Sequence, residues 1–367
     1  MMEIIHGAEC QVAEVDGVRL VVTKLGGHLT ADFRLGERVV SPYALAPWKQ
    51  DEVGLELPVL LTHLRGDFLC LPFGPQDDGP PHGETANGEW QSEEGETQGV
   101  QLVMRTGDTK ASVRKKVSLR EGHRALYIEH EISELVGEWS YGSHPILDFS
   151  TVKEGRVSVS PFRWASVNPG VFSDPMNREY QSLEPGAKFD DLREVPLMNG
   201  GTTDLTTYPA RQGYDDLVMM VSEESDAPFA WTACVMDGYV WFSLKNVADF
   251  PATLFWISNG GRHGEPWAGN HQRRLGLEEV CSYFAGNVTE SRKNPLAGEG
   301  IPTVREFDGS PVSLRLIQGV AGVSEDFDLV KEIVPDGEGR VTLRSESGVE
   351  ITVTLDWGFL LNSPEAS

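Results

Sequence analysis

The segment LYIEHEI, residues 126–132, shows the pattern that decides the fold class. Leu126 and Ile128 would lie on one face of an extended chain, and Tyr127 and Glu129 would lie on the other. Successive side chains of a β-strand point to opposite faces of the sheet, so this alternation predicts a half-buried strand.

The alternating pattern recurs at residues 240–245 and 349–357, and short turn sequences separate such segments. Asp16-Gly17 and Asp237-Gly238 are typical of tight hairpin turns, because Asp and Gly tolerate the positive φ angles that these turns require. Helical periodicity is scarce, and residues 324–334 fit either a short helix or a strand. We therefore predict an all-β protein, a large antiparallel β-sandwich with long loops and little helix.

The length of the chain allows more than one domain organisation. A chain of 367 residues commonly forms two domains, but all-β architectures also run longer as one unit. No internal repeat or low-complexity linker divides the chain, and residues 160–213 predict long connections folded over one face. We therefore predict a single domain over residues 1–363, followed by a disordered tail at residues 364–367.

The net charge and the cysteine content limit the classes of partner and the cellular compartment that we expect. With 56 acidic and 31 basic residues, the formal net charge of −25 repels nucleic acid and anionic membrane surfaces. The four cysteines lie far apart without a CxxC pair, as expected in a reducing compartment. We see neither a signal peptide nor an apolar segment long enough to span a bilayer. We therefore expect a cytoplasmic protein that binds neither nucleic acid nor membranes.

The stretch WISNGGRHGEPWAGNHQRRLGLEEVCSYF, residues 256–284, is the first candidate for a functional site. After a turn sequence it carries Arg262, Trp267 and His271, and it ends in an apolar segment that contains Glu278. Polar and aromatic side chains near the ends of strands are typical of small-molecule sites. The alternative is a long surface loop with a solvated cluster of charges.

Three further stretches carry residues of the same kinds. Arg65 and His82 lie in a segment broken by Gly and Pro turns, His144 precedes a proline that favours extended geometry, and Asp215 enters a short apolar strand. Taken singly, each histidine also fits a hydrogen-bonded structural role, and the aspartate also fits a turn.

Together these stretches resemble the aldose 1-epimerase (galactose mutarotase-like) superfamily. The matching motifs, in the order of the family, are His82-Gly83 followed by Trp90, His144-Pro145, Tyr214-Asp215 and Leu277-Glu278. The resemblance covers most of the chain and implies the mutarotase-like supersandwich. It also implies an enzyme that interconverts the α and β anomers of an aldose without a cofactor.

By this resemblance, three residues carry the chemistry. Glu278 is the base that takes the proton of the C1 hydroxyl, and His144 is the acid that protonates the ring oxygen. His82 would hydrogen-bond near the ring oxygen or assist as an acid. Glu279 is the rival of Glu278, but neighbours in a strand point to opposite faces, so only one of them can enter the site. The family register favours Glu278, and we expect substitution of Glu279 to be nearly silent.

The remaining candidates would bind the sugar. Arg65 and Asp215 would hold hydroxyl or anionic groups, and Trp267 or Trp90 would offer an apolar face to the ring. Arg262 and His271 complete the predicted substrate-binding set.

One position departs from the family pattern. The Leu64-Arg65-Gly66 segment is similar to the branch acting on hexose 6-phosphates, but Ala86 stands where relatives often carry an arginine. We therefore expect a neutral sugar to be preferred over its 6-phosphate, unless Arg273 or Arg274 supplies the missing cation.

Other chemistries lack the expected spacing. The chain has no HxH or HExxH pattern for a metal and no GxSxG for a nucleophilic serine, so we predict neither a metal nor a cofactor. Two alternatives stay open, a non-catalytic sugar binder or sensor and a different sugar-active enzyme on the same scaffold. The presence of both Glu278 and His144 favours catalysis. The sequence indicates no oligomeric state.

Overall fold

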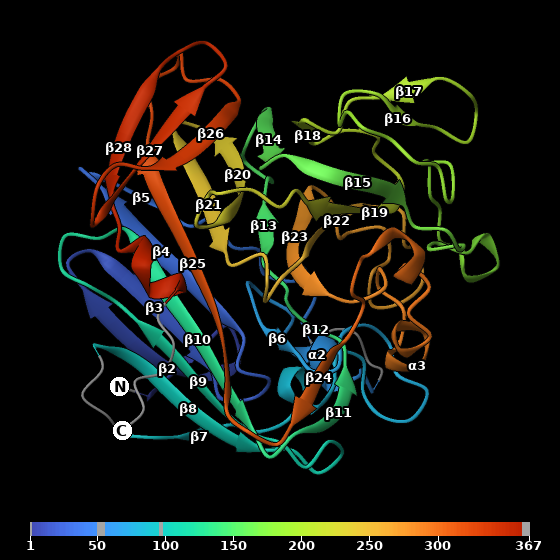
Figure 1. The fold of residues 1–367 in the computed structure, drawn as a ribbon, viewed down its shortest axis with the longest axis horizontal. Coiled ribbons are helices and arrows are strands. Elements are labelled where there is room, and N and C mark those ends of the chain that lie inside the picture. Colours follow the sequence, from blue (N-terminus) through green and yellow to red (C-terminus); the bar gives the residue numbers. More distant parts are fainter. Residues whose placement is uncertain (1, 50–55, 95–97, 362–367) are drawn as a thin grey trace.

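The computed structural model describes residues 2–49, 56–94 and 98–361. About 47% of the chain is strand and 6% is helix. The strands form antiparallel sheets, and the two largest face one another across the main core (Figure 1). The prediction of an all-β sandwich with little helix is therefore confirmed.

The larger of the two sheets has nine strands and provides one side of the core. Its strands, in spatial order, are β18 (Thr207–Tyr208), β14 (Gly155–Val159), β20 (Ala230–Met236), β21 (Tyr239–Lys245), β25 (Val312–Gly322), β10 (Ala125–Ser133), β9 (Ser112–Ser118), β8 (Gly99–Arg105) and β7 (Gln91–Ser92). The strand predicted at residues 126–132 is confirmed as part of β10.

The second large sheet has seven strands and carries the site described below. It consists of β15 (Phe162–Val167), β19 (Tyr214–Ser222), β22 (Ala252–Asn259), β23 (Arg274–Cys281), β12 (Tyr141–Ser143) and β6 (Leu69–Cys70), with β13 (Ile146–Asp148) paired to β23. Side chains alternate along β23. Leu275 and Leu277 enter the core between the two sheets, whereas Val280 packs in a separate cluster on the outer face.

Smaller elements complete the fold. The remaining strands are β1 (Met2–Ile5), β2 (Ala8–Val15), β3 (Val18–Thr23), β4 (Leu29–Leu35), β5 (Arg38–Val40), β11 (Val136–Trp139), β16 (Val195–Pro196), β17 (Thr202–Thr203), β24 (Arg305–Asp308), β26 (Val330–Pro335), β27 (Arg340–Ser345) and β28 (Glu350–Thr354). The helical elements are α2 (Val59–Thr62), α3 (Val288–Arg292) and the 3₁₀ turns η1 (Glu84–Ala86), η2 (Pro175–Asn177), η3 (Ala297–Glu299) and η4 (Trp357–Leu360). Asp16-Gly17 and Asp237-Gly238 join β2 to β3 and β20 to β21, as predicted.

Two strand predictions need correction. Residues 240–245 form a strand, but it is buried on both faces rather than one. The reason is the sheet of β26, β27 and β28, whose Val341 and Leu343 pack in one cluster with Phe242 on the outer face of β21. The strand predicted at residues 349–357 ends at Thr354, and η4 follows it.

Two longer segments were only partly anticipated. Of residues 324–334, which fitted a helix or a strand, the last part is β26. Residues 160–213 consist mostly of connections and short strands, but they also contain β15, an edge strand of the seven-stranded sheet. The single-domain prediction stays a prediction, and the predicted tail at residues 364–367 lies outside the described residues.

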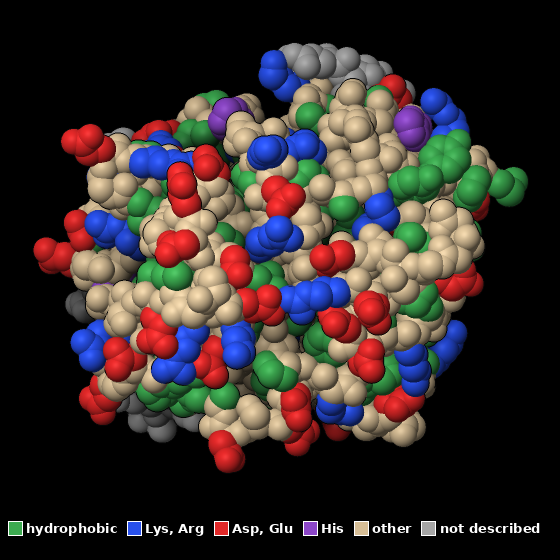
Figure 2. Space-filling view, turned by 90° about the horizontal axis from the view of Figure 1, so that it is seen from above, with side chains coloured by type: hydrophobic (Ala, Val, Ile, Leu, Met, Phe, Trp, Pro, Cys, Tyr) green, Lys and Arg blue, Asp and Glu red, His purple; other side chains and the backbone are tan. Residues whose placement is uncertain are grey.

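The charged side chains are spread over the surface. Figure 2 shows Lys and Arg side chains interspersed with Asp and Glu on the face seen from above. Many charged side chains of the molecule form exposed ion pairs, such as Arg114 with Glu131 at 2.7 Å, and such pairs contribute little to stability. Among the described helices, none has the length and apolar character needed to cross a membrane.

Candidate functional site

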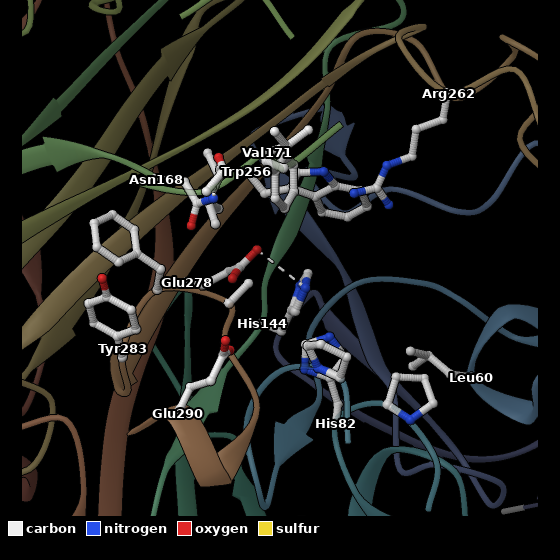
Figure 3. Close-up of a pocket in the computed structure, with 18 of the residues that line it drawn as sticks. Leu60, His82, His144, Asn168, Val171, Trp256, Arg262, Glu278, Tyr283 and Glu290 are labelled. Atoms are coloured by element: carbon white, nitrogen blue, oxygen red, sulfur yellow. Dashed lines mark hydrogen bonds and ion pairs between the residues drawn. The ribbon is translucent and has the colours of Figure 1, made fainter. Parts of the chain in front are cut away.

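A cavity of about 560 Å³ opens on the outer face of the seven-stranded sheet. Leu217, Trp256 and Glu278 contribute to it from β19, β22 and β23, and residues 168–172 and 283–286 form walls beside them (Figure 3). This volume falls within the usual range for small-molecule sites, and most lining residues are apolar, as is common in such sites.

Two titratable side chains, Glu278 and His144, point toward one another in this cavity (Figure 3). Glu278 Oε1 lies 3.2 Å from His144 Nε2, and the two side chains are only 3% and 7% exposed. A hydrogen bond can form at this distance, so the two groups can share a proton.

The strand pairing explains why these residues meet. Strand β23 pairs with both β12 and β13, and His144 lies in the connection between those two strands. Leu277 N donates to Pro145 O at 2.9 Å, which fixes the connection beside Glu278. Gly276 leaves space for the carboxylate, because a Cβ at this position would lie 2.6 Å from Glu278 Oε1.

Burial controls the charge of both groups. It raises the pKa of Glu278 well above the ordinary value of 4.5, with Arg262 opposing the shift and Asp67 adding to it. It lowers the pKa of His144 well below 6.5, and the neighbouring His82 lowers it further. Both shifts favour the uncharged forms, so near neutral pH the pair holds one proton between its two members.

His82 lies next to this pair as a neutral ring. Its ring centroid is 5.1 Å from that of His144, and the two rings are nearly perpendicular, at 85°. Gly74 N–H donates to His82 Nδ1 at 3.3 Å, which places the ring proton on Nε2. Burial lowers the pKa of His82 to about 4, so the uncharged ring can donate a hydrogen bond from Nε2.

Glu279 points away from the cavity, into the space between the two large sheets. Its carboxylate accepts hydrogen bonds from Thr232 Oγ1 and Thr253 Oγ1, both at 2.8 Å, and lies 2.6 Å from Lys245 Nζ. The side chains of Glu279 and Lys245 are 0% and 1% exposed. The expectation that only one of the two adjacent glutamates can enter the site agrees with this geometry.

Arg262 lines the cavity inside an aromatic enclosure. Its guanidinium carbon lies 5.0 Å from the ring centre of Trp267, 5.5 Å from that of Trp256 and 5.1 Å from that of Phe172. Arg262 Nε lies 3.4 Å from Asp215 Oδ2. The cation is therefore neutralised by Asp215 and packed against aromatic faces.

Asp215 and His271 lie behind this wall and support it. Asp215 accepts hydrogen bonds from Ser258 Oγ at 2.8 Å and from Gly261 N at 2.9 Å. Ser258 Oγ lies 2.7 Å from His271 Nδ1, and His271 stacks on Trp256 with ring centroids 5.3 Å apart. Of the predicted sugar-binding residues, Arg262 and Trp267 line the cavity, while Asp215 and His271 hold the lining residues in place.

Arg65 lies elsewhere. Its guanidinium donates to main-chain oxygens of Ile5, His6 and His63 at 3.0 to 3.2 Å. These contacts tie Arg65 to the end of β1 and direct it away from the cavity lining. This position does not support the predicted role of Arg65 in substrate binding.

The other cations and the second candidate tryptophan also lie outside the cavity. Trp90 is fully buried in the main core and donates from Nε1 to Thr85 O. Arg273 donates to Phe149 O, and Arg274 Nη1 lies 2.7 Å from Asp148 Oδ1. Neither arginine replaces the cation that is missing at position 86.

Several lining residues were missed in the sequence. Asn168 and Val171 come from the segment predicted as connections, and Leu60 comes from α2. Nothing in their local pattern marks them, because they reach the cavity only through the folding of distant segments over β19 and β22. Tyr283 lies within the candidate stretch at residues 256–284, but nothing in the sequence distinguished it as a residue that lines the cavity.

Three buried polar atoms at the cavity stand out. Within the described residues, Trp256 Nε1, His144 Nδ1 and Arg262 Nε have no hydrogen-bond partner, although Arg262 Nε lies within ion-pair distance of Asp215. Buried polar groups are usually satisfied, so Trp256 Nε1 is a donor that a ligand can engage. In the part of the chain that the structure describes, no three His, Cys, Asp or Glu side chains gather as metal ligands would.

Comparisons with known proteins identify the fold. No protein-family model matches the chain, and no curated protein matches it in sequence. A galactose mutarotase related enzyme from Lactobacillus acidophilus is 10% identical, with a TM-score of 0.56 over 86% of this chain and 98% of that one. A candidate aldose 1-epimerase from Escherichia coli K12 is 14% identical, with a TM-score of 0.54 over 86% of this chain and 99% of that one.

A galactose mutarotase-like protein from Lactobacillus casei gives a similar result, at 12% identity and a TM-score of 0.51 over 85% of this chain and 100% of that one. Each likeness extends over most of both chains. At this level of identity the likeness concerns the fold and not the chemistry. The structural neighbours identified by the comparisons are thus those that the sequence motifs indicated, and the chain has the fold of galactose mutarotase-related proteins.

Proposed function

We propose that the protein interconverts the α and β anomers of an aldose at this cavity. The observation that carries the proposal is the Glu278–His144 pair, because it places two proton-transfer groups 3.2 Å apart in a buried cavity. The fold shared with mutarotase-related proteins supports it.

The reaction needs one base and one acid on a single sugar. In the reacting form of the pair, the shared proton has passed from Glu278 to His144 across the 3.2 Å contact. The Glu278 carboxylate then takes the proton of the C1 hydroxyl while His144 gives its proton to the ring oxygen. The bond between C1 and the ring oxygen then breaks, and a carbonyl forms at C1. After rotation about the C1–C2 bond, both proton transfers run in reverse and the ring closes on the other face. Proton count and redox state are unchanged, so the reaction requires no cofactor.

The other lining residues bind the sugar in this proposal. His82 Nε2–H donates to an oxygen near the reacting centre, and Trp256 Nε1–H donates to a hydroxyl. Trp267 presents an apolar ring face to the sugar. His82 acts as a hydrogen-bond donor rather than as an acid, because burial lowers its pKa to about 4.

The charge of the cavity favours a neutral substrate. Among its described lining residues, Arg262 is the only Lys or Arg, and it already pairs with Asp215. Glu278 and Glu290 place two carboxyl groups around the same space. A phosphate at C6 would find no free cation in this described lining, so we propose a free aldose.

Polarimetry or NMR exchange spectroscopy started from a pure anomer tests the proposal. We expect the wild-type protein to bring a free aldose to anomeric equilibrium faster than the spontaneous reaction. A panel of aldoses, screened first by ligand-induced thermal stabilisation, identifies the sugar. A protein that binds a sugar and leaves the exchange at the spontaneous rate would instead be the non-catalytic binder or sensor named above.

Two further expectations accompany this proposal. We expect a small-molecule sugar as substrate, with no nucleic-acid or membrane partner, in a protein located in the cytoplasm. A different sugar-active enzyme on the same scaffold would show itself by a product other than the opposite anomer.

A further inference from the structure

Behind His144, on the side away from the cavity, the buried carboxylate of Asp67 collects hydrogen bonds. Asp67 is 1% exposed. Asp67 Oδ1 accepts from His144 N at 2.7 Å, and Ser143 Oγ lies 2.7 Å from both carboxylate oxygens. Gln318 Nε2 donates to Oδ2, also at 2.7 Å. Three residues therefore converge on one side chain that the proposed reaction does not use.

These hydrogen bonds form one directed chain across the core. Trp241 Nε1 lies 3.5 Å from Tyr43 OH, Tyr43 OH donates to Gln318 Oε1 at 2.6 Å, and Gln318 donates to Asp67. Trp241 and Gln318 belong to β21 and β25 of the nine-stranded sheet, whereas His144 follows β12 of the seven-stranded sheet. Asp67 thus connects the main chain of His144 to the sheet on the other side of the core.

The backbone of Asp67 is itself fixed. Leu29 N donates to Asp67 O at 2.8 Å, and Asp67 N donates to Leu29 O at 2.9 Å. Gly66, at a φ of 49°, permits this close approach, because a Cβ there would lie 1.7 Å from Leu29 O. Held at its backbone, Asp67 can act as a rigid anchor for the residues that donate to it.

We propose that Asp67 is a positioning residue, which fixes the main chain of His144 against the opposite sheet and so sets the distance between His144 and Glu278. The inference rests on the proposed function for its effect on rate, but not for its effect on the geometry of His144. Every neighbour that hydrogen-bonds to the carboxylate does so as a donor, which is the arrangement that an ionised acceptor requires.

The charged and titratable groups around Asp67 come from several elements. Lys115 of β9 attracts the carboxylate and lowers the pKa of Asp67. The negative charge of Asp67 in turn raises the pKa of Cys70 in β6 and, on the cavity side, the pKa of Glu278 in β23. Tyr43 and His144 are the other titratable neighbours. Burial raises the pKa of Asp67, and Lys115 together with the hydrogen bonds opposes that shift. Loss of the charge should therefore make Glu278 easier to ionise.

The test uses a swap of hydrogen-bonding partners. Asp67→Asn keeps the shape, but its single side-chain oxygen cannot accept from both His144 N and Gln318 Nε2, so an NH₂ group faces one of these donors. In the double variant Asp67→Asn with Gln318→Glu, the amide oxygen at position 67 still accepts from Ser143 and His144, while the amide NH₂ donates to the new carboxylate at position 318. Tyr43 OH also donates to that carboxylate. The swap thus gives each of these donors an acceptor again and moves the negative charge one residue away from the site.

We expect Asp67→Asn to speed the hydrogen exchange of the His144 amide at least tenfold and to shift the ring signals of His144 in NMR spectra, which His144→Asn assigns. Because small displacements of a reacting group cost on the order of a hundredfold in rate, kcat should fall by about 10- to 100-fold with little change in KM. The alkaline limb of the pH–rate profile should move to lower pH. The swap should restore the amide protection and most of kcat.

Asp216→Asn is the matched control. Asp216 is also 1% exposed, and it accepts hydrogen bonds from Ser182 N, Ser182 Oγ and Leu183 N at 2.7 to 2.8 Å. This control should lower thermal stability without altering the hydrogen exchange of the His144 amide or the pH–rate profile.

Two outcomes decide the proposal. Unchanged amide exchange and ring signals in Asp67→Asn would overturn it, whether or not the protein is active. A wild-type protein inactive on every sugar, with His144 still perturbed by Asp67→Asn, would reject the enzyme while keeping the positioning role.

Discussion

Adjacent glutamates of β23 occupy the two faces of one strand, and their surroundings differ in every respect that matters for function. Glu279 lies in a closed network in which Lys245, Thr232 and Thr253 satisfy its carboxylate. Glu278 lies at the cavity, where His144 is its one ion-pair partner among the described residues. The comparison teaches that a satisfied buried carboxylate is structural, whereas an incompletely satisfied one beside a cavity is available for chemistry.

The strongest test of this contrast removes the proposed base. Glu278→Gln keeps the size of the side chain but cannot take a proton, so mutarotation should fall by roughly 10²- to 10⁴-fold. Sugar binding should stay within a few-fold, and the free energy of unfolding should change little, because burial already favours the uncharged form of the carboxyl group that Gln replaces. Polarimetry and denaturant unfolding measure the two effects. A variant with wild-type mutarotation would remove Glu278 from the mechanism.

His144→Asn tests the partner of that base. It removes the acid, so the rate should again fall by roughly 10²- to 10⁴-fold. Since the two groups act as a unit, the double variant Glu278→Gln with His144→Asn should lose little beyond either single variant. Additive losses, seen as a product of the two single effects, would show that the residues act in separate steps.

Glu279→Gln should give the opposite result. The substitution leaves the buried Lys245 without its counter-charge, and breaking a buried pair in this way costs about 3–5 kcal/mol of stability. The sequence predicted that Glu279→Gln would be nearly silent; we now expect it to be silent for the rate but not for stability. The variant, assayed well below its unfolding temperature, should retain the wild-type kcat. A large loss of kcat in the folded variant would place Glu279 in the mechanism as well.

The pH–rate profile sharpens the assignment of one shared proton. On acidification the pair gains a second proton, which produces the acidic limb of the profile. Because burial lowers the pKa of His144 from 6.5, this acidic limb should lie well below pH 6.5. At high pH the pair loses its last proton, which produces the alkaline limb. Because burial raises the pKa of Glu278 from 4.5, this alkaline limb should lie well above pH 4.5. The result should be a broad bell between two macroscopic pKa values of the pair. A profile that rises through pH 6.5 with a single pKa would contradict the shared proton.

The smallest expected effect concerns phosphate. A 6-phosphate should bind a few-fold more weakly than the free sugar, because Arg262 is already paired with Asp215 and Glu290 adds a negative charge to the lining. Isothermal titration with glucose and glucose 6-phosphate measures the difference. Tighter binding of the phosphate would show that Arg262 leaves Asp215 for the ligand.

The sequence by itself determined the features that depend on neighbouring residues. Alternation predicted β10, the Asp-Gly pairs predicted two hairpins, and the period of a strand predicted that Glu278 and Glu279 would point to opposite faces. These properties follow from local backbone geometry, which a short segment fixes by itself. The motif order also indicated the fold, because it reflects many local patterns at once.

The tertiary structure alone decided which elements pack over one another and where side chains from distant segments point. Strand β21 is buried on both faces only because β26, β27 and β28 lie over it, and Arg65 leaves the cavity because the end of β1 offers it carbonyl groups. Asp67 showed no sequence signal, since its partners Ser143 and Gln318 lie far away along the chain. Contacts of this kind depend on how distant segments meet, and no local period encodes that meeting.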